Sequence, residues 1–170
     1  MQGLIIENKA NLYKIKLGDI NYIATARGKF KNDSFTPVVG DIAEFSIVDE
    51  NKKTAVIESV KERVSYIKRP KLANINQIVF VVSSKHPKPD LLLLDKQLAF
   101  AEFLHIKPVI VLNKIDLDDK HEFLNIQKIY EEIGYKVIQT DAKNGIGVEE
   151  ILLELKNNIS AFAGNSGVGK

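Results

Sequence analysis

The chain has 170 residues, of which 45% are hydrophobic and 27% charged, and its formal net charge is +2. This composition is typical of a globular protein, and because no apolar run approaches the ~20 residues of a membrane span, we expect a cytoplasmic protein with no membrane partner. The absence of cysteine excludes disulfides and thiolate metal sites, and His86, His105 and His121 lack metal-ligand spacing, so we expect no metal ligands.

Residues 1–63 contain five short runs of β-branched and aromatic residues separated by turn signals. The runs are residues 4–6, 12–17, 20–26, 42–48 and 54–60. Apolar and polar residues alternate in some of them, which predicts strands with one buried face. We predict five antiparallel strands that close into a small barrel of the oligonucleotide-binding (OB) type.

A basic loop follows the third predicted strand. Arg27, Lys29 and Lys31 surround an aromatic ring, a composition that can follow a nucleic-acid backbone and stack a base. Residues 1–75 contain 13 Lys and Arg against 9 Asp and Glu, whereas residues 76–170 contain 11 against 13. The basic first half favours an anionic partner. The loop therefore indicates RNA contact, with an ordinary solvated turn as the alternative.

A basic linker, residues 64–76, is predicted between the barrel and a second domain, residues 77–170. Strands are predicted at residues 77–83, 108–112, 136–139 and 160–163, and helices at residues 91–104, 120–133 and 148–157. Asp90 is the expected N-cap of the first helix. Apolar strands that alternate with helices predict an α/β domain with a mostly parallel sheet, whose ligands bind beyond the carboxyl ends of the strands.

Asn113, Lys114, Ile115 and Asp116 follow the second of these strands in an N-K-x-D pattern. An ionised Asp offers two adjacent acceptors for the N1–H and N2–H donors of guanine, a donor pair that adenine lacks. The Lys stem can lie along the base, and Asn113 can tie the loop to neighbouring backbone. The pattern predicts a guanine-reading loop, although four polar residues after a strand can also simply cap the next helix.

Two further loops follow the last two strands of the predicted sheet. Ala142 and Lys143 lie in a Gly-containing turn, where a backbone N–H could donate to guanine O6 and a lysine could cover the base. The last seven residues match the phosphate-binding pattern G-x-x-x-x-G-K, in which backbone N–H groups and the lysine bind phosphates. They are Gly164, Asn165, Ser166, Gly167, Val168, Gly169 and Lys170. Each loop taken alone could be an ordinary turn.

Along this chain, the two predicted base-reading loops come before the predicted phosphate loop. In ordinary small GTPases the phosphate loop comes first, so the order indicates a circular permutation. Together with the barrel, Arg69-Pro70 and Leu94-Asp95-Lys96, these motifs make the chain resemble the RsgA (YjeQ) family of ribosome small-subunit-dependent GTPases. The resemblance spans essentially all 170 residues. It implies a β plus α/β fold class: an OB-type barrel followed by the N-terminal part of a circularly permuted P-loop GTPase domain. Another permuted ribosome-assembly GTPase fits less well, because such families lack the barrel.

The resemblance implies GTP binding and hydrolysis during late assembly of the 30S ribosomal subunit, with contact to 16S rRNA through the barrel, by a protein that acts as a monomer. It implies GTP or GDP with Mg²⁺ and a C-terminal zinc-binding domain outside this chain. It also implies that the N-K-x-D residues, Ala142 and Lys143 read guanine, that residues 164–170 bind phosphate, and that Lys170 is catalytic.

This chain departs from the family pattern at two places. Asp141 stands where the second base motif usually has Ser, and the chain ends before the Mg²⁺-binding Ser or Thr, the switch regions and the zinc ligands. We therefore expect that the 170-residue chain alone lacks turnover. The alternative is an RNA-binding module with an incomplete, non-hydrolysing nucleotide fold.

Overall fold

The computed structural model describes residues 1–28, 36–119 and 121–170. The chain divides into two compact units, Met1–Asn74 and Ile75–Lys170. Residues 64–76, for which we expected a linker, are divided between the two units, and most of them belong to the first.

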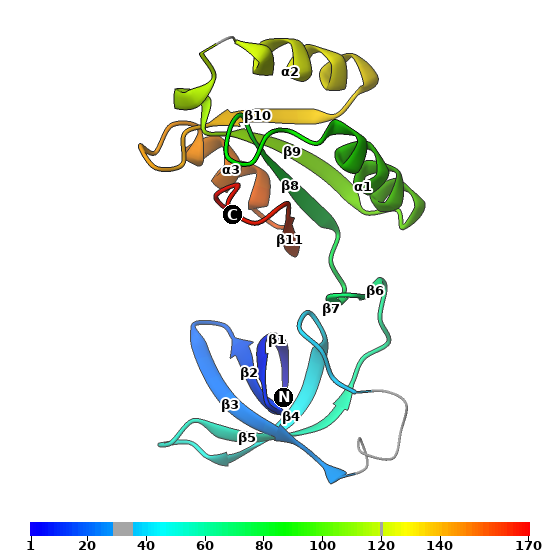
Figure 1. The fold of residues 1–170 in the computed structure, drawn as a ribbon. Helices are drawn as coiled ribbons and strands as arrows, with labels where there is room; N and C mark the ends of the chain where they lie inside the picture. The colour runs from blue at the N-terminus through cyan, green and yellow to red at the C-terminus, as the bar shows by residue number, and fades with distance from the viewer. Residues whose placement is uncertain (29–35, 120) are drawn as a thin grey trace. The chain divides into compact units, whose positions relative to one another are not determined.

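Five strands of the first unit form a closed barrel in the order β1-β2-β3-β5-β4 (Figure 1). They are β1 (Gln2–Lys9), β2 (Leu12–Leu17), β3 (Ile20–Ala26), β4 (Ile42–Asp49) and β5 (Thr54–Val60). The predicted five-stranded OB-type barrel is thus confirmed. β1 extends past the predicted residues 4–6 because its polar end pairs with β2 as far as Lys9 opposite Leu12.

The expectation that all five strands are antiparallel was wrong. β3 and β5 run parallel, with Ile23 opposite Thr54 and Ala26 opposite Ile57, whereas the other neighbouring pairs of the barrel are antiparallel. A closed ring with an odd number of strands cannot alternate in direction all the way round, so at least one pair must be parallel. Closure of the barrel therefore decides this pairing.

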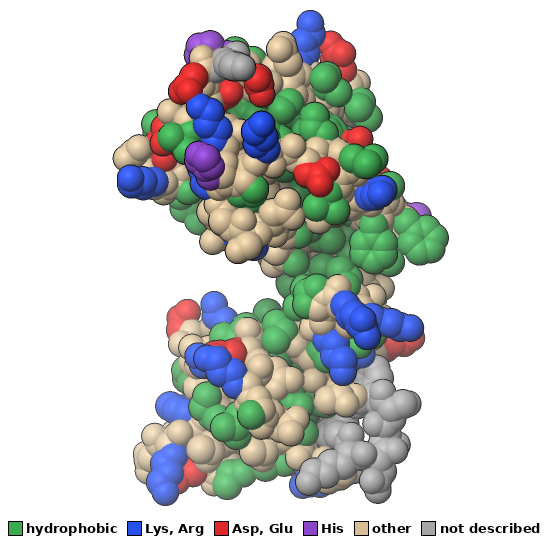
Figure 2. All heavy atoms as spheres, viewed as in Figure 1, with side chains coloured by type: hydrophobic (Ala, Val, Ile, Leu, Met, Phe, Trp, Pro, Cys, Tyr) green, Lys and Arg blue, Asp and Glu red, His purple; other side chains and the backbone are tan. Residues whose placement is uncertain are grey.

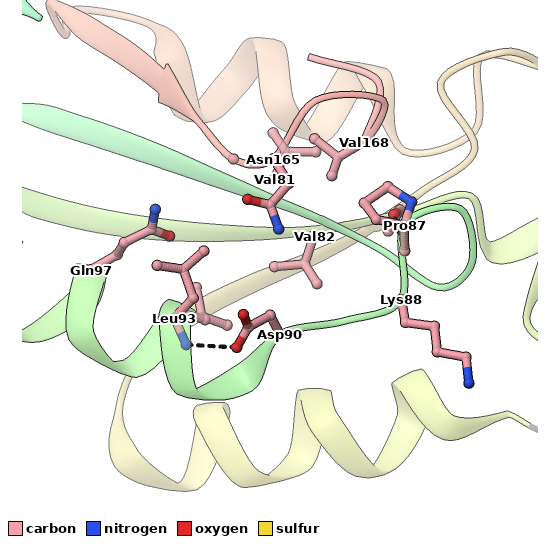
Figure 3. A pocket seen from close by; sticks show the side chains of 12 residues that line it. Val81, Val82, Pro87, Lys88, Asp90, Leu93, Gln97, Asn165 and Val168 are labelled. Atoms are coloured by element: carbon pink, nitrogen blue, oxygen red, sulfur yellow. Dashed lines mark hydrogen bonds between the residues drawn. The ribbon is translucent and has the colours of Figure 1, made fainter.

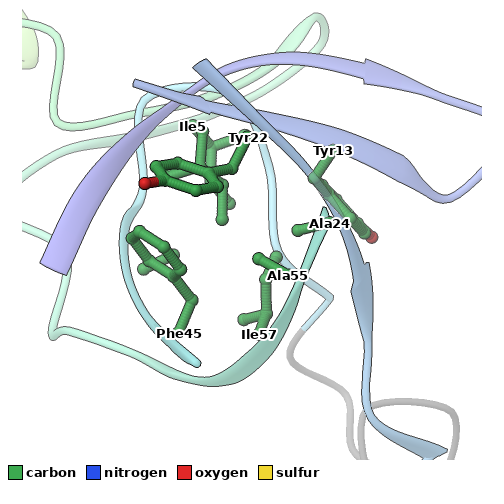
Figure 4. Packing of buried hydrophobic residues seen from close by; sticks show 9 residues of the cluster. Ile5, Tyr13, Tyr22, Ala24, Phe45, Ala55 and Ile57 are labelled. Atoms are coloured by element: carbon green, nitrogen blue, oxygen red, sulfur yellow. The ribbon is translucent and has the colours of Figure 1, made fainter. Parts of the chain in front are cut away.

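Apolar side chains from alternate positions of the strands fill the barrel (Figure 4). The buried cluster consists of Ile5, Tyr13, Ile15, Tyr22, Ala24, Ala43, Phe45, Ala55 and Ile57. The rings of Tyr22 and Phe45 lie 5.5 Å apart, centre to centre, in a tilted arrangement that suits aromatic pairs. Gly3 leaves room for this core, since a Cβ there would lie 2.6 Å from the Ile15 side chain.

A short antiparallel hairpin occupies part of the segment predicted as a linker. It consists of β6 (Tyr66–Lys68) and β7 (Lys71–Ala73). Leu72 forms an isolated parallel bridge with Val39, in the segment that leads into β4. Hydrophobic periodicity did not indicate these strands, because each is only three residues long.

The second unit contains a four-stranded sheet in the order β10-β9-β8-β11 (Figure 1). Its strands are β8 (Gln77–Ser83), β9 (Lys107–Asn113), β10 (Lys136–Thr140) and β11 (Ser160–Ala163), and every neighbouring pair is parallel. The predicted strand-helix alternation is confirmed. Because the strands are parallel, the loops that follow them meet at one edge of the sheet.

Three α-helices connect these strands in the described residues: α1 (Leu91–Phe103), α2 (Glu122–Ile133) and α3 (Val148–Leu155). Figure 1 shows α2 and α3 on opposite faces of the sheet. Asp90 caps α1 as predicted, since its carboxylate accepts from the backbone N–H of Leu93 at 2.9 Å. None of the described helices is long and apolar enough to cross a membrane.

Candidate functional site

Asn113, the last residue of β9, connects three loops at the carboxyl edge of the sheet. Its side chain is buried, with 3% exposure. Nδ2 donates to the carbonyl oxygen of Val168 at 2.9 Å. Oδ1 accepts from the hydroxyl of Thr140 at 2.9 Å and from the backbone N–H of Ala142 at 3.1 Å. One buried amide thus brings together the N-K-x-D loop, the second base loop and the glycine-rich loop.

Lys114 strengthens the link between these loops. Its backbone is left-handed, with φ of 64°, and its Nζ donates at 2.6 Å to the carbonyl oxygens of His86 and Gly167. The hydroxyl of Ser84 in turn donates to the Lys114 carbonyl oxygen at 2.6 Å. Sequence reasoning missed Ser84 and His86, because the loop after β8 carries no recognisable motif and acts here mainly through backbone atoms.

The Asp116 carboxylate is exposed and has no hydrogen-bond donor among the described residues. It lies in a short 3₁₀ helix, Ile115–Leu117. The start of α2 is capped by Asp118 instead, whose two carboxylate oxygens accept from the backbone N–H groups of Glu122 and Phe123 at 3.0 Å each. Helix capping is therefore the role of Asp118, and the Asp116 carboxylate is available to a ligand.

A pocket of about 340 Å³ opens between the two predicted base loops. It is lined by Asn113, Lys114, Asp116, Leu117, Asp141, Ala142, Lys143 and Gly169. Its volume lies within the range of about 300–1,000 Å³ that is typical of small-molecule sites. Six residues were predicted to read the base, and all of them except Ile115 line this pocket. Gly169 of the predicted phosphate loop lines it as well.

Asp141 occupies the position at which the resemblance implies Ser, and its carboxylate binds within its own loop. The side chain is buried, with 3% exposure. It accepts from the backbone N–H of Asn144 at 3.2 Å and from the Asn144 Nδ2 group at 2.5 Å. Asp141 also exchanges two backbone hydrogen bonds with Ile146. The extra negative charge is therefore held by Asn144 and stabilises the turn that presents Ala142.

The glycine-rich loop has the backbone conformation that its glycines permit. Gly164, Gly167 and Gly169 have φ values of 146°, 84° and 91°. A Cβ at Gly169 would lie 2.4 Å from the Asn113 Nδ2 atom, so only glycine fits beside this amide. Val168 anchors the loop from below, since its side chain is 2% exposed and packs in the core with Val81 and other apolar residues of the sheet.

The polar groups of this loop are suited to an anion. Within the described part of the chain, the backbone N–H groups of residues 165–170 donate no hydrogen bond. Lys170 Nζ donates to the carbonyl oxygens of Gly164 and Asn165 at 2.7 and 2.8 Å, which keeps its charge over the loop. Successive free N–H groups beside a lysine form a phosphate-binding arrangement.

A smaller hollow separates the glycine-rich loop from the start of α1 (Figure 3). Asn165 and Val168 form its upper side, and Asp90 and Leu93 lie across from them. Its volume is about 20 Å³, enough for about one water molecule. This hollow is therefore too small to hold a nucleotide base.

An ion pair joins the loop after β8 to the loop after β9 at the rim of the site. Lys85 hydrogen-bonds the Asp119 carboxylate and thereby lowers the pKa of that carboxyl below its ordinary value. No group of three or more His, Cys, Asp or Glu side chains that could hold a metal ion occurs in residues 1–28, 36–119 and 121–170.

The predicted RNA-binding loop is described only in part. Arg27 has a 61% exposed side chain and pairs with Glu58 at 2.8 Å. Lys29 and Lys31 lie outside the described residues.

Two family models match the chain: RsgA N-terminal domain over residues 2–57 and RsgA GTPase over residues 60–170. Curated relatives include the small ribosomal subunit biogenesis GTPase RsgA of Caldanaerobacter subterraneus subsp. tengcongensis, 39% identical over 170 residues, and that of Ruminiclostridium cellulolyticum, 40% identical over 170 residues. The alignments cover 100% and 99% of this chain, and 57% and 55% of the respective relatives. The chain thus spans little more than half their length.

Two solved structures share the fold. The crystal structure of YjeQ from Thermotoga maritima superposes with a TM-score of 0.84 and 33% identity, covering 99% of this chain and 62% of that one. The structure of YloQ, a circularly permuted GTPase, superposes with a TM-score of 0.81 and 30% identity, covering 99% and 61%. The agreement extends over both units.

Proposed function

This chain belongs to the RsgA GTPase family, and from that premise we propose that it supplies the guanine-reading, phosphate-binding and RNA-contacting parts of a GTPase that acts in small ribosomal subunit biogenesis. The observation that carries the proposal is the buried Asn113 side chain, which joins three loops around one pocket. We further infer a monomer that works in the cytoplasm on the 30S subunit and its 16S rRNA.

Guanine recognition is assigned to Asp116, whose carboxylate has no protein donor in the described residues and borders the 340 Å³ pocket. Two charge-assisted bonds to guanine N1–H and N2–H, at about 1.5–3 kcal/mol each, supply most of the discrimination against adenine. The Ala142 backbone N–H donates to Asn113 Oδ1, which fixes the loop, and Ala142 lines the pocket. Lys143 and the Lys114 stem cover the base.

Phosphate binding is assigned to residues 164–170, because their backbone N–H groups donate no bond to the described residues. Lys170 is the proposed catalytic residue of this chain. When GTP binds, the Lys170 ammonium leaves the carbonyl oxygens of Gly164 and Asn165 and binds phosphate oxygens instead. There it offsets the negative charge that develops as water attacks the γ-phosphate.

A GTPase of this type also uses Mg²⁺, but the described residues contain no cluster suited to it or to Zn²⁺. No step of the proposed chemistry is therefore assigned to a metal ligand of this chain. The residues present account for base recognition and for the backbone and lysine part of phosphate binding.

The proposed function is tested by GTP hydrolysis of the full-length protein, measured with and without purified small ribosomal subunits. We expect slow hydrolysis alone and clear stimulation by the subunits. Lys170→Ala is the matched variant and should bind subunits but lose the stimulated rate. Absence of hydrolysis under both conditions would favour the rival function, an RNA-binding module without turnover.

A protein consisting only of residues 1–170 is expected to show no useful GTP turnover, because its glycine-rich pattern is not followed by the Ser or Thr that holds Mg²⁺ in such loops. The measurement is single-turnover hydrolysis, compared with the full-length protein under identical conditions. Equal rates would contradict this expectation.

RNA contact is assigned to Arg27, Lys29 and Lys31, on the strength of their charge and of the exposed Arg27 side chain. Replacing all three by Ala is expected to flatten the log–log salt dependence of subunit binding by about 2–3 units, because each neutralised phosphate releases counterions. The slope is measured by equilibrium binding over a series of KCl concentrations. An unchanged slope would identify the loop as a solvated turn.

A further inference from the structure

We propose that the tip of the β6–β7 hairpin is a second RNA-binding surface, distinct from the loop after β3, and that it binds phosphate groups of the RNA backbone. The surface, here called the hairpin tip, consists of Lys68, Arg69 and Lys71. The proposal rests on the proposed function only in taking the small ribosomal subunit as the partner. Figure 2 shows Lys and Arg side chains gathered over this hairpin.

The charges of the hairpin tip are not compensated. All three side chains belong to exposed residues, and none forms an ion pair with a carboxylate of the described chain. Lys68 and Lys71 are directly opposite each other in the hairpin register. Like charges at opposed positions destabilise a strand pair. An anion at the tip would relieve this repulsion.

A turn of the barrel, in the same unit as the hairpin, shows a different arrangement. The lysines of the β4–β5 turn pair with their own loop, Lys52 with Asp49 at 3.8 Å and Lys53 with Glu50 at 3.3 Å. That turn is close to locally neutral, whereas the hairpin tip carries three positive charges within four residues. The tip is therefore the better candidate for binding an anion.

The hairpin is firmly attached to the barrel at its base. Asn74 accepts from the backbone N–H of Val64 at 2.8 Å and donates from Nδ2 to the Gly40 carbonyl oxygen at 2.9 Å. Its own N–H donates to the Ser65 carbonyl oxygen at 2.9 Å. Gly40 has φ of 92°, and a Cβ there would lie 1.9 Å from the Ala73 carbonyl oxygen, so this close packing requires glycine.

Arg63 provides a second attachment. Its guanidinium makes two bonds of 2.8 Å to the fully buried Asp41 carboxylate and one of 2.9 Å to the Thr36 carbonyl oxygen. It also lies over the ring of Tyr66, 4.6 Å from its centre. Because the base of the hairpin is fixed, the tip presents its cations with little loss of backbone entropy on binding.

These features favour the phosphodiester backbone of RNA, and not an acidic protein surface, as the partner of the hairpin tip. An arginine fork can bind one phosphate bidentately, and two lysines beside it provide point charges for neighbouring phosphates. The apolar side chains exposed at this hairpin, Tyr66 at 37% and Pro70, are fewer than the three cations, whereas a protein partner would be expected to bury a larger apolar patch at the core of its interface.

The test is the triple variant Lys68→Ala/Arg69→Ala/Lys71→Ala in the full-length protein. Two probes are used: purified small ribosomal subunits and a plain RNA duplex of arbitrary sequence. Affinity is measured over a series of KCl concentrations. We expect the log–log slope to fall by about 2–3 units on both probes. Affinity for fluorescent GDP is expected to stay unchanged, because the nucleotide pocket lies in the second unit.

Two control variants are matched to this one. Lys9→Ala/Lys52→Ala/Lys53→Ala removes the same charge from the same unit but from lysines that pair with carboxylates, and it should leave the slope nearly unchanged. Lys68→Arg/Lys71→Arg retains the charge and should retain the slope. Near-ultraviolet circular dichroism confirms that each variant is folded.

An unchanged slope on both probes would overturn the proposal. So would a reduced slope on subunits with no change on the RNA duplex, because that result would assign the tip to an acidic ribosomal protein. If the unaltered protein fails to bind subunits in every nucleotide state, the proposed function fails, and the RNA duplex still decides whether the tip binds phosphate.

Discussion

Asp116→Asn in the full-length protein is expected to weaken GTP binding about a hundredfold and to strengthen binding of xanthosine triphosphate. The substitution replaces one carboxylate oxygen by an N–H₂ group that faces the N2–H₂ group of guanine, so one hydrogen bond is lost and two donors meet, at a cost of about 3 kcal/mol. Xanthine has a carbonyl at this position, which accepts from the new amide. Competition with fluorescent GDP measures both affinities.

The control for this prediction is Asp118→Asn, the same chemical change two residues further along the chain. Asp118 caps α2 through the N–H groups of Glu122 and Phe123. Its substitution removes one of the two acceptor oxygens, so it should lower stability by about 1 kcal/mol or less and leave the preference for GTP over xanthosine triphosphate unchanged. Equal losses for both nucleotides in Asp116→Asn would assign a structural role to Asp116, and unchanged GTP affinity would remove it from the site.

Asn113→Ala is expected to reduce affinity for GDP and GTP at least tenfold and to lower the free energy of unfolding by about 3 kcal/mol. The change removes three hydrogen bonds from a buried side chain and leaves the groups of Val168, Thr140 and Ala142 without this partner. Both base loops and the glycine-rich loop then lose their common attachment. Nucleotide titration below the melting temperature, together with thermal unfolding, separates the two effects.

Two further variants serve as controls for the Asn113→Ala prediction. Thr140→Val removes only one of the three bonds to Asn113 and should cost about 1 kcal/mol of stability, with a smaller loss of affinity. Asn125→Ala makes the same truncation on the exposed face of α2 and should change neither quantity. If Asn113→Ala lowers stability but leaves nucleotide affinity intact, the amide only supports the fold and does not organise the site.

Hydrophobic patterning predicted the helices and strands closely where the element has a buried face. The apolar run of residues 77–83 coincides with β8, and the Asp90 cap begins α1 as predicted. Agreement was poorer at polar ends. The predicted helix 148–157 ends at Leu155, and the predicted strand 4–6 extends over Gln2–Lys9, because hydrogen bonds to neighbouring backbone decide such boundaries.

The three loops predicted to bind nucleotide each directly follow a strand of the parallel sheet, as expected from the sequence. In a parallel sheet, the carboxyl ends of strands meet at one edge, so position in the sequence predicts proximity in space. The sequence did not indicate that Lys114 bonds the backbone of His86 and Gly167, or that Asn144 binds the Asp141 carboxylate. Backbone acceptors leave no signature in residue type.

The sequence by itself determined the five strands of the barrel, the α/β order of the second unit and the positions of the loops that follow its strands, because burial and local motif chemistry depend on residue type and spacing. Only the tertiary structure decided the parallel pairing of β3 with β5, the β6–β7 hairpin and the joining of three loops by Asn113. The β3–β5 pairing and the joining of the loops depend on segments distant in the chain, which meet only when the barrel has closed or the sheet has formed. The hairpin is local but too short to show periodicity, and it is placed by the bridge between Val39 and Leu72.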